Sequence, residues 1–102
     1  MTNLFLNLVG LEAIELEQLD YTVGIAFSSG DHVNIENHCS ILDHRPGDRP
    51  GILKALDISD ELVVFRFESG ARVEVAFTAA GWRGPEAMCW SRASDDAIIV
   101  WN

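Results

Sequence analysis

Basic residues are scarce in this sequence, where 7 lysines and arginines stand against 16 aspartates and glutamates and give a formal net charge of -9. Nucleic-acid binding needs clustered lysine and arginine to neutralise phosphates, so this balance argues against a nucleic-acid partner. The same excess permits a basic protein partner, because complementary charges speed encounter. The simpler interpretation is that the acidity only keeps the protein soluble.

Cysteine is also rare. Cys39 and Cys89 lack the spacing of metal ligands, and two cysteines do not make the disulfide framework of a small secreted domain. We therefore expect two thiols in a reducing cytoplasm. The opening residues 1–8 are apolar but short and lack a basic start, which predicts neither a signal peptide nor a membrane span. A cytoplasmic protein without a membrane partner is the expectation.

The usual motifs of catalysis are missing from the sequence, including a glycine-rich phosphate loop with its lysine and a Gly-x-Ser-x-Gly elbow. The most reactive-looking pair is His38-Cys39, because an adjacent imidazole can activate a thiolate. Neighbours on a strand point to opposite faces, however, so these two side chains are poor partners. The acidic run at Glu12, Glu15 and Glu17 is best interpreted as a solvated strand face.

The histidines give no better case for a metal. His32, His38 and His44 follow one another in six-residue steps, which match no common metal site. We therefore expect a non-enzymatic protein with no catalytic residue, metal or cofactor, in which the histidines face solvent and the thiol is buried. The alternative is a small-molecule-binding or hydrolytic β-domain that uses Cys39 and the nearby histidines.

The clearest positive signal is a pattern that occurs twice. Residues 27–35 (FSSGDHVNI) return forty positions later as residues 67–75 (FESGARVEV). Apolar residues alternate with polar or small ones on both sides of each Ser-Gly pair, which is the period of a half-buried strand. Glycine accepts the positive φ that a tight hairpin turn demands. The pattern predicts one β-hairpin used twice.

Further strands flank the two hairpins. Residues 11–19 fit a helix or a strand, and we choose the strand because Ile14 and Leu16 alternate with acids. Residues 4–9 are predicted as a short strand or an apolar plug. The connection at 43–51 contains Arg-Pro-Gly twice, and neither helix nor strand can run through it. The closing strand, 98–101, is apolar on both sides, which suggests burial inside a sheet.

These observations predict an all-β fold: two pseudo-symmetric three-stranded meanders plus a C-terminal hairpin, forming a small sandwich or roll. The chain is expected to be a single β-rich domain over residues 1–102. Its parts are repeat one at 11–42, repeat two at 52–79 and the C-terminal hairpin at 87–102. The predicted core consists of the inward-facing apolar residues, namely Val23, Ile25, Phe27, Val33, Ile35, Val63, Phe65, Phe67, Val73, Val75 and Trp101.

The end of the chain supports a resemblance. The two Ser-Gly hairpins, the segment 84–88 (GPEAM) and the closing 99–101 (IVW) together resemble a family of small bacterial two-repeat β-domains of unknown function. Such domains are similar to immunity proteins of toxin–immunity pairs, including contact-dependent inhibition systems. The resemblance covers most of the chain, although Met88-Cys89-Trp90 departs from a plain alternating strand. It implies a binding protein that neutralises a cognate toxin, and it implies no catalytic residues.

Loops are where a partner is expected to bind, because loops on a rigid scaffold often carry binding residues. Trp82, between a glycine and an arginine, is the best aromatic candidate, since tryptophan is a frequent hot-spot residue. The partner would be a cognate toxin domain of basic character, and a homodimer is a further possibility. The predicted partner contacts are Asp43, His44, Asp48, Trp82 and Glu86.

Overall fold

The computed structural model describes residues 3–78 and 86–101, and it is built almost entirely of strands. The prediction of an all-β fold is confirmed. One short 3-10 helix precedes the strands. The elements are η1 (Leu4–Leu8), β1 (Glu12–Leu19), β2 (Thr22–Phe27), β3 (His32–Ile35), β4 (Cys39–Leu42), β5 (Gly51–Ile58), β6 (Leu62–Phe67), β7 (Arg72–Ala76), β8 (Met88–Ser91) and β9 (Ile98–Trp101).

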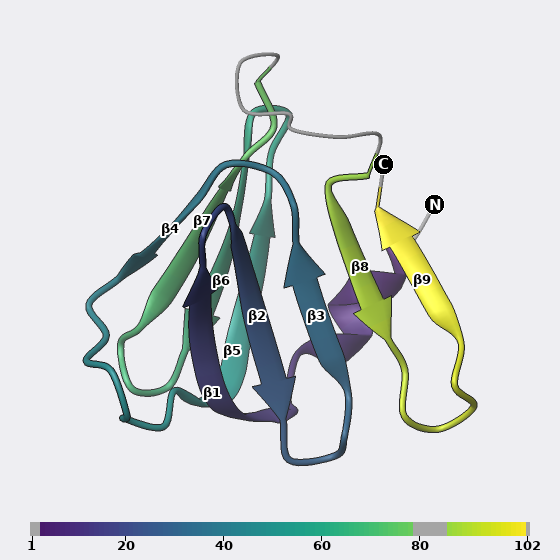
Figure 1. Cartoon of the computed structure of the whole chain (residues 1–102), viewed down its shortest axis with the longest axis horizontal. Helices are drawn as coiled ribbons and strands as arrows, with labels where there is room; N and C mark the ends of the chain where they lie inside the picture. Colours follow the sequence, from purple (N-terminus) through teal and green to yellow (C-terminus); the bar gives the residue numbers. More distant parts are fainter. Residues whose placement is uncertain (1–2, 79–85, 102) are drawn as a thin grey trace.

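The nine strands of the described residues belong to one antiparallel sheet in the order β4-β7-β6-β5-β1-β2-β3-β8-β9. The two halves of the sheet meet at a narrow seam, where β1 pairs with β5 through Glu12↔Ile52 and Ala13↔Gly51. Figure 1 shows β1, β2 and β3 lying in front of β5, β6 and β7. The inner faces of both halves contribute to a single apolar cluster. The sheet therefore folds over on itself and encloses its core.

The two repeats share the hydrogen bonds and glycine conformations of their turns and the positions of their bulges. In the first turn the Gly30 N–H donates to the Phe27 carbonyl, and in the second the Gly70 N–H donates to the Phe67 carbonyl. Both glycines have positive φ, 93° and 97°, which a residue with a Cβ adopts only at a cost. β1 and β5 each carry a bulge at the matching place, between Ala13 and Glu15 in one and between Leu53 and Ala55 in the other.

The two halves are related by a pseudo-twofold axis that lies at the seam. Glu12 and Ile52 are forty positions apart, so they are equivalent residues of the two repeats, and they pair with each other. Their carbonyls accept the equivalent hydrogen bonds, from Ser28 N–H at 2.8 Å and from Glu68 N–H at 2.9 Å. The pseudo-twofold axis therefore passes between these two residues.

The strand that follows each meander crosses to the other half. β4 follows β3 but pairs with β7, and β8 follows β7 but pairs with β3. The Ala76 N–H donates to the His38 carbonyl at one crossing, and the Glu36 N–H donates to the Ala87 carbonyl at the other, both at 2.8 Å. β9 breaks the symmetry, because it extends the sheet beyond β8 only.

The N-terminal segment is a plug and not a strand. It forms η1, whose Phe5 and Leu8 are buried, and the Asn3 side chain caps it by accepting from the Phe5 N–H at 2.9 Å. The Phe5 ring packs edge-on against Trp90 and Trp101, with centroids 5.9 and 5.1 Å away. The segment thereby seals the core on the β8–β9 side.

The placement of the last strand was predicted wrongly. β9 is the outermost strand on its side of the sheet and not an inner one. Ile98 is 64% exposed and Val100 40% exposed, whereas Ile99 and Trp101 turn inward. An edge strand next to a folded sheet has only one face to bury, so apolar character on both faces did not indicate burial here. Trp101, predicted as core, is half-buried.

The remaining predicted core is confirmed, because the other ten residues are each at most 4% exposed. Trp90, which the prediction did not include, joins them at 4%. Its indole N–H donates to Asp31 Oδ1 at 3.0 Å, and the Ala93 N–H donates to the same oxygen at 3.0 Å. Asp31 therefore ties the β2–β3 turn to β8 and the segment after it. The equivalent residue in repeat two is Ala71, whose methyl side chain cannot accept hydrogen bonds.

Replacing Phe65 by alanine should lower the free energy of unfolding by about 3–5 kcal/mol, because a fully buried ring is lost and a cavity remains. Urea melts of the wild type and the variant measure this loss. Ile98→Ala is the matched control, and its exposed side chain should change stability by less than about 1 kcal/mol. A loss below about 1 kcal/mol for Phe65→Ala would place this ring outside the core.

Asp31→Ala should cost about 1–3 kcal/mol, because it leaves the buried Trp90 N–H without an acceptor. Burial raises the pKa of Asp31, but hydrogen bonds from Ser29, the Ala93 N–H and Trp90 outweigh it and hold the pKa below its usual value. The carboxylate therefore stabilises the fold above about pH 4, and this contribution is lost as pH falls through the lowered pKa. Asp31→Asn should abolish that part of the acid sensitivity, as urea melts between about pH 7 and pH 3 would show. Equal acid sensitivity in wild type and Asp31→Asn would contradict this assignment.

Candidate functional site

An open groove of about 540 Å³ lies between β1 and the segment formed by β4 and the connection after it. We call it the β1–β4 groove. Beyond its bulge, β1 pairs with β2 alone, and β4 is the outermost strand on its side of the sheet. Two strand edges therefore border the groove. Its lining residues are Ile14, Glu15, Leu16, Glu17, Gln18, Ile41, His44, Pro46, Gly47 and Asp48.

The connection 43–50 forms one wall through tight turns. Asp43 adopts the left-handed conformation, with φ 54°, as the chain leaves β4. The first Arg-Pro-Gly then closes a turn, in which Gly47 has φ 90° and the Asp48 N–H donates to the Arg45 carbonyl at 3.1 Å. The second Arg-Pro-Gly ends at Gly51, where β5 begins. The loop therefore holds His44 and Asp48 against the groove.

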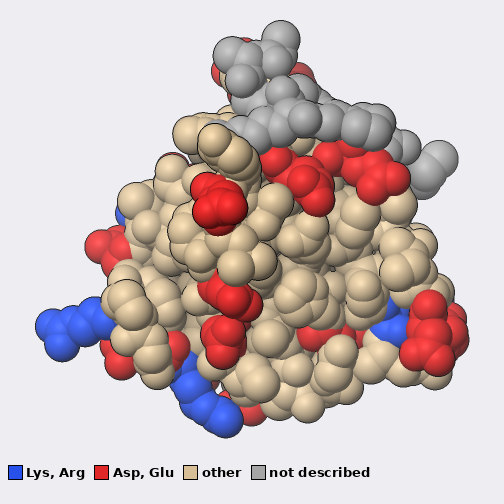
Figure 2. Space-filling view, viewed as in Figure 1, with Lys and Arg blue, Asp and Glu red and all other residues tan. Residues whose placement is uncertain are grey.

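The groove lining combines acidic and apolar side chains. Glu15, Glu17 and Asp48 line it together with Ile14 and Ile41, and its lining contains neither lysine nor arginine. The ion pairs of the described residues use other carboxylates. Figure 2 shows acidic side chains over the middle of this face, with basic side chains at its lower left margin and at its right. A groove of this kind suits a ligand that combines positive charge with apolar side chains.

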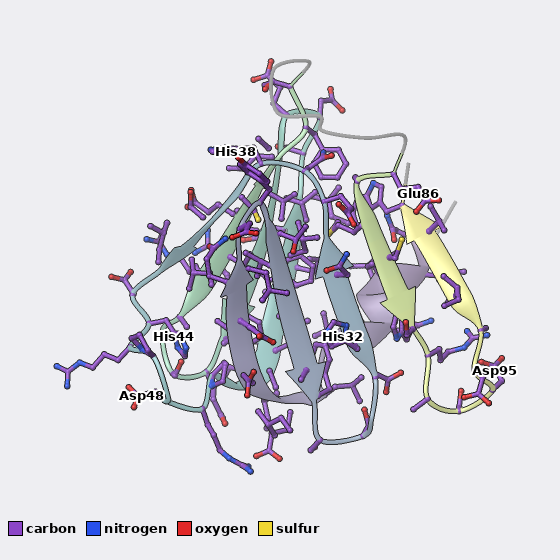
Figure 3. All side chains as sticks on the ribbon, in the orientation of Figure 1. His32, His38, His44, Asp48, Glu86 and Asp95 are labelled. Carbon is purple, nitrogen blue, oxygen red and sulfur yellow. The ribbon has the colours of Figure 1, made fainter. Side chains whose placement is uncertain are left out.

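The predicted contact residues are only partly brought together. His44 and Asp48 both line the groove. Asp43, in the same loop, is exposed and accepts from Arg72 at 3.2 Å. Glu86 lies well away from His44 and Asp48, beside β8 (Figure 3), where it accepts a hydrogen bond from the Cys89 thiol at 2.9 Å. Trp82 lies outside the described residues.

The β1 wall of the groove was not among the predicted contact residues. Glu15 and Glu17 were predicted to lie on a solvated strand face. Both side chains are exposed, but they also line the groove. The alternation that predicted the strand gave their face correctly. It could not show that β4 would come to lie across from them, because that depends on the crossing of β4 to β7.

The histidines and cysteines do not assemble into a reactive centre. Figure 3 shows His32, His38 and His44 at three separate places, and in residues 3–78 and 86–101 no group of three histidine, cysteine or acidic side chains could hold a metal ion. His32 is exposed and lies over Gly24, where an added Cβ would come within 3.1 Å of Nε2. Cys39 is half-buried against the core, and the groove lining does not include it.

Comparison with known proteins adds no relative. The sequence matches no protein-family model, and the curated proteins and the solved structures also give no match. The resemblance to immunity proteins therefore stays a prediction. Among the described residues, no helix has the length and apolar character that spanning a membrane requires.

The Cys89 thiol should be a poor nucleophile. Burial, the hydrogen bond to Glu86 and the negative charges of Glu86 and Glu36 raise its pKa to about 11. In a Cys39→Ser background, alkylation of Cys89 near pH 8 should be roughly a hundredfold slower than that of an ordinary cysteine, because only the thiolate reacts. Mass spectrometry of quenched iodoacetamide reactions measures the rate. Glu86→Gln should speed it, and a wild-type rate equal to that of a short cysteine peptide would contradict the raised pKa.

Proposed function

We propose that this chain is a non-enzymatic binding protein of the immunity type, which neutralises a cognate toxin domain in the cytoplasm by occluding it. The observation that carries the proposal is the β1–β4 groove, whose lining combines Glu15, Glu17 and Asp48 with apolar side chains and contains no lysine or arginine. The net charge of -9 adds a long-range field of the same sign. The fitting partner is a basic protein.

The physical steps of such binding are separable. The acidic surface draws a basic partner in by long-range attraction, which raises the association rate. Apolar contacts with Ile14 and Ile41 then slow dissociation, since desolvated anchors carry most binding energy. The surrounding sheet encloses a packed core, so the groove is held ready for its partner and little ordering is needed on binding.

The hydrolytic alternative has less support. It needs a thiolate and an imidazole within reach of each other, whereas His44 lines the groove and Cys39 is absent from that lining. His38 precedes Cys39 but is exposed, while Cys39 packs against the core. The binding function therefore remains the one that we propose.

The direct test is to find and challenge the partner. Tagged wild-type chain is purified from the source cell, and each co-purifying protein is expressed in a host with and without this chain. A co-purifying basic protein that stops growth alone, and is tolerated when the chain is present, supports the proposal. If every co-purifying protein is harmless, or if the chain gives no protection, the immunity function is wrong.

Reversing the charge of the groove should weaken this complex. Glu15→Lys/Glu17→Lys should slow association roughly tenfold or more at low salt and flatten its salt dependence, because screening then has less attraction to remove. Biolayer interferometry at low and high salt measures both effects. The control is Asp60→Lys/Glu61→Lys, at exposed positions before β6, which makes the same change in net charge.

Protection against the toxin should follow the same order. Cys39→Ser should protect as well as the wild type, whereas the groove variant should protect poorly. If Cys39→Ser abolishes protection and the groove variant binds as the wild type does, thiol chemistry must replace the binding function.

A further inference from the structure

Within residues 3–78 and 86–101, no strand pairs with the outer edge of β4, whereas the outer edge of its counterpart β8 is paired. β4 and β8 are equivalent strands, because each follows one meander and pairs with the third strand of the other. β8 is paired on its second side by β9, whereas β4 is the last strand of the described sheet. β9 therefore shows what kind of element fits such an edge, namely one extended strand.

The backbone of β4 is oriented to accept a strand. The Ala76 N–H donates to the His38 carbonyl at 2.8 Å, and the register continues as Ser40↔Glu74 and Leu42↔Arg72. Hydrogen-bonded pairs recur at every second residue of an antiparallel ladder. Ser40 and Leu42 therefore bond to β7, and the N–H and carbonyl of Ile41 point to the outer edge.

The side chains below this edge specify what the strand should carry. In β9, Ile99 and Trp101 pack inward while Ile98 and Val100 are exposed. A strand beside β4 would likewise direct every second side chain toward Ile41, which packs against the core and lines the β1–β4 groove. Glu15 and Glu17 line the same groove and would receive basic side chains from that strand.

We propose that β4 takes up an extended segment of a basic partner protein as an additional strand, with alternating apolar and basic residues. This inference rests on the proposed function, for which it supplies the mode of binding. Strand addition obtains affinity from main-chain hydrogen bonds and specificity from pockets for alternate side chains. A second copy of this chain is a poor occupant, because it carries the same net charge of -9.

The probe is a short capped peptide in which isoleucine alternates with lysine, with a peptide of the same composition in two blocks as control. Hydrogen exchange of the wild-type chain is followed by NMR with and without each peptide. The alternating peptide should slow exchange of the Ile41 N–H roughly tenfold or more, because that group gains a hydrogen bond. The Ser40 N–H, already bonded to β7, should change little.

Two substitutions provide the matched test. Ile41→Pro removes the outward N–H but leaves the bonds to β7, and edge strands tolerate proline at such positions. It should weaken binding of the alternating peptide roughly tenfold or more, since strand addition depends on that group. Ile41→Val keeps the N–H and should bind as the wild type does. If Ile41→Pro fails to fold, the exchange of Ile41 in the wild type decides alone.

The opposite results are equally clear. Strand addition is wrong if the alternating peptide does not bind, or if it binds while exchange at Ile41 is unchanged, since that would be an electrostatic complex only. Protection against a toxin that survives Ile41→Pro, in a chain that folds, refutes strand addition but not the proposed function. Strand addition of the peptide without any protection refutes the proposed function alone.

Discussion

The exchange of β4 and β8 between the two meanders is the constraint on which the rest of this structure depends. The seam between β1 and β5 is short, and by itself it would leave the two halves free to open. The crossing strands close them over a common core, because each hydrogen-bonds to the opposite half. Burial of the inner faces then stabilises the closed arrangement, and the same crossing places β4 across from β1 and so creates the groove.

The two repeats are alike in sequence and differ where extra structure has been added. Asp31 stands where repeat two has Ala71, and it anchors Trp90 and the backbone of Ala93 on one side of the molecule. η1 and β9 fill the same side with Phe5 and Trp101. The other side lacks these additions among the described residues and keeps the open groove. The asymmetry of the additions, rather than the repeat, therefore determines where a ligand could bind.

The parts of the fold that could be predicted from the sequence are those that depend on neighbouring residues. Alternation and the Ser-Gly turns predicted both hairpins, and ten of the eleven chosen core residues are buried. The pairing of strands that are distant in the sequence was not predictable, because the residues of β4 and β8 do not indicate which strands they pair with. His44 and Asp48 were chosen because they lie in a loop, and they do line the groove. Glu15 and Glu17 were not chosen as contact residues, because only the crossing of β4 to β7 makes them part of a site.

The crossing also means that neither repeat is a complete folding unit. A chain consisting of residues 11–42 alone would possess β1, β2, β3 and β4, but the partner of its β4 would be the third strand of another meander. Two such chains could exchange their last strands, so that the β4 of each pairs with the third strand of the other, as in a domain-swapped dimer. The pseudo-twofold axis between Glu12 and Ile52 is then the axis such a dimer would have. The present chain has the arrangement of such a swapped dimer within one polypeptide, with residues 43–50 as the connection between the two repeats.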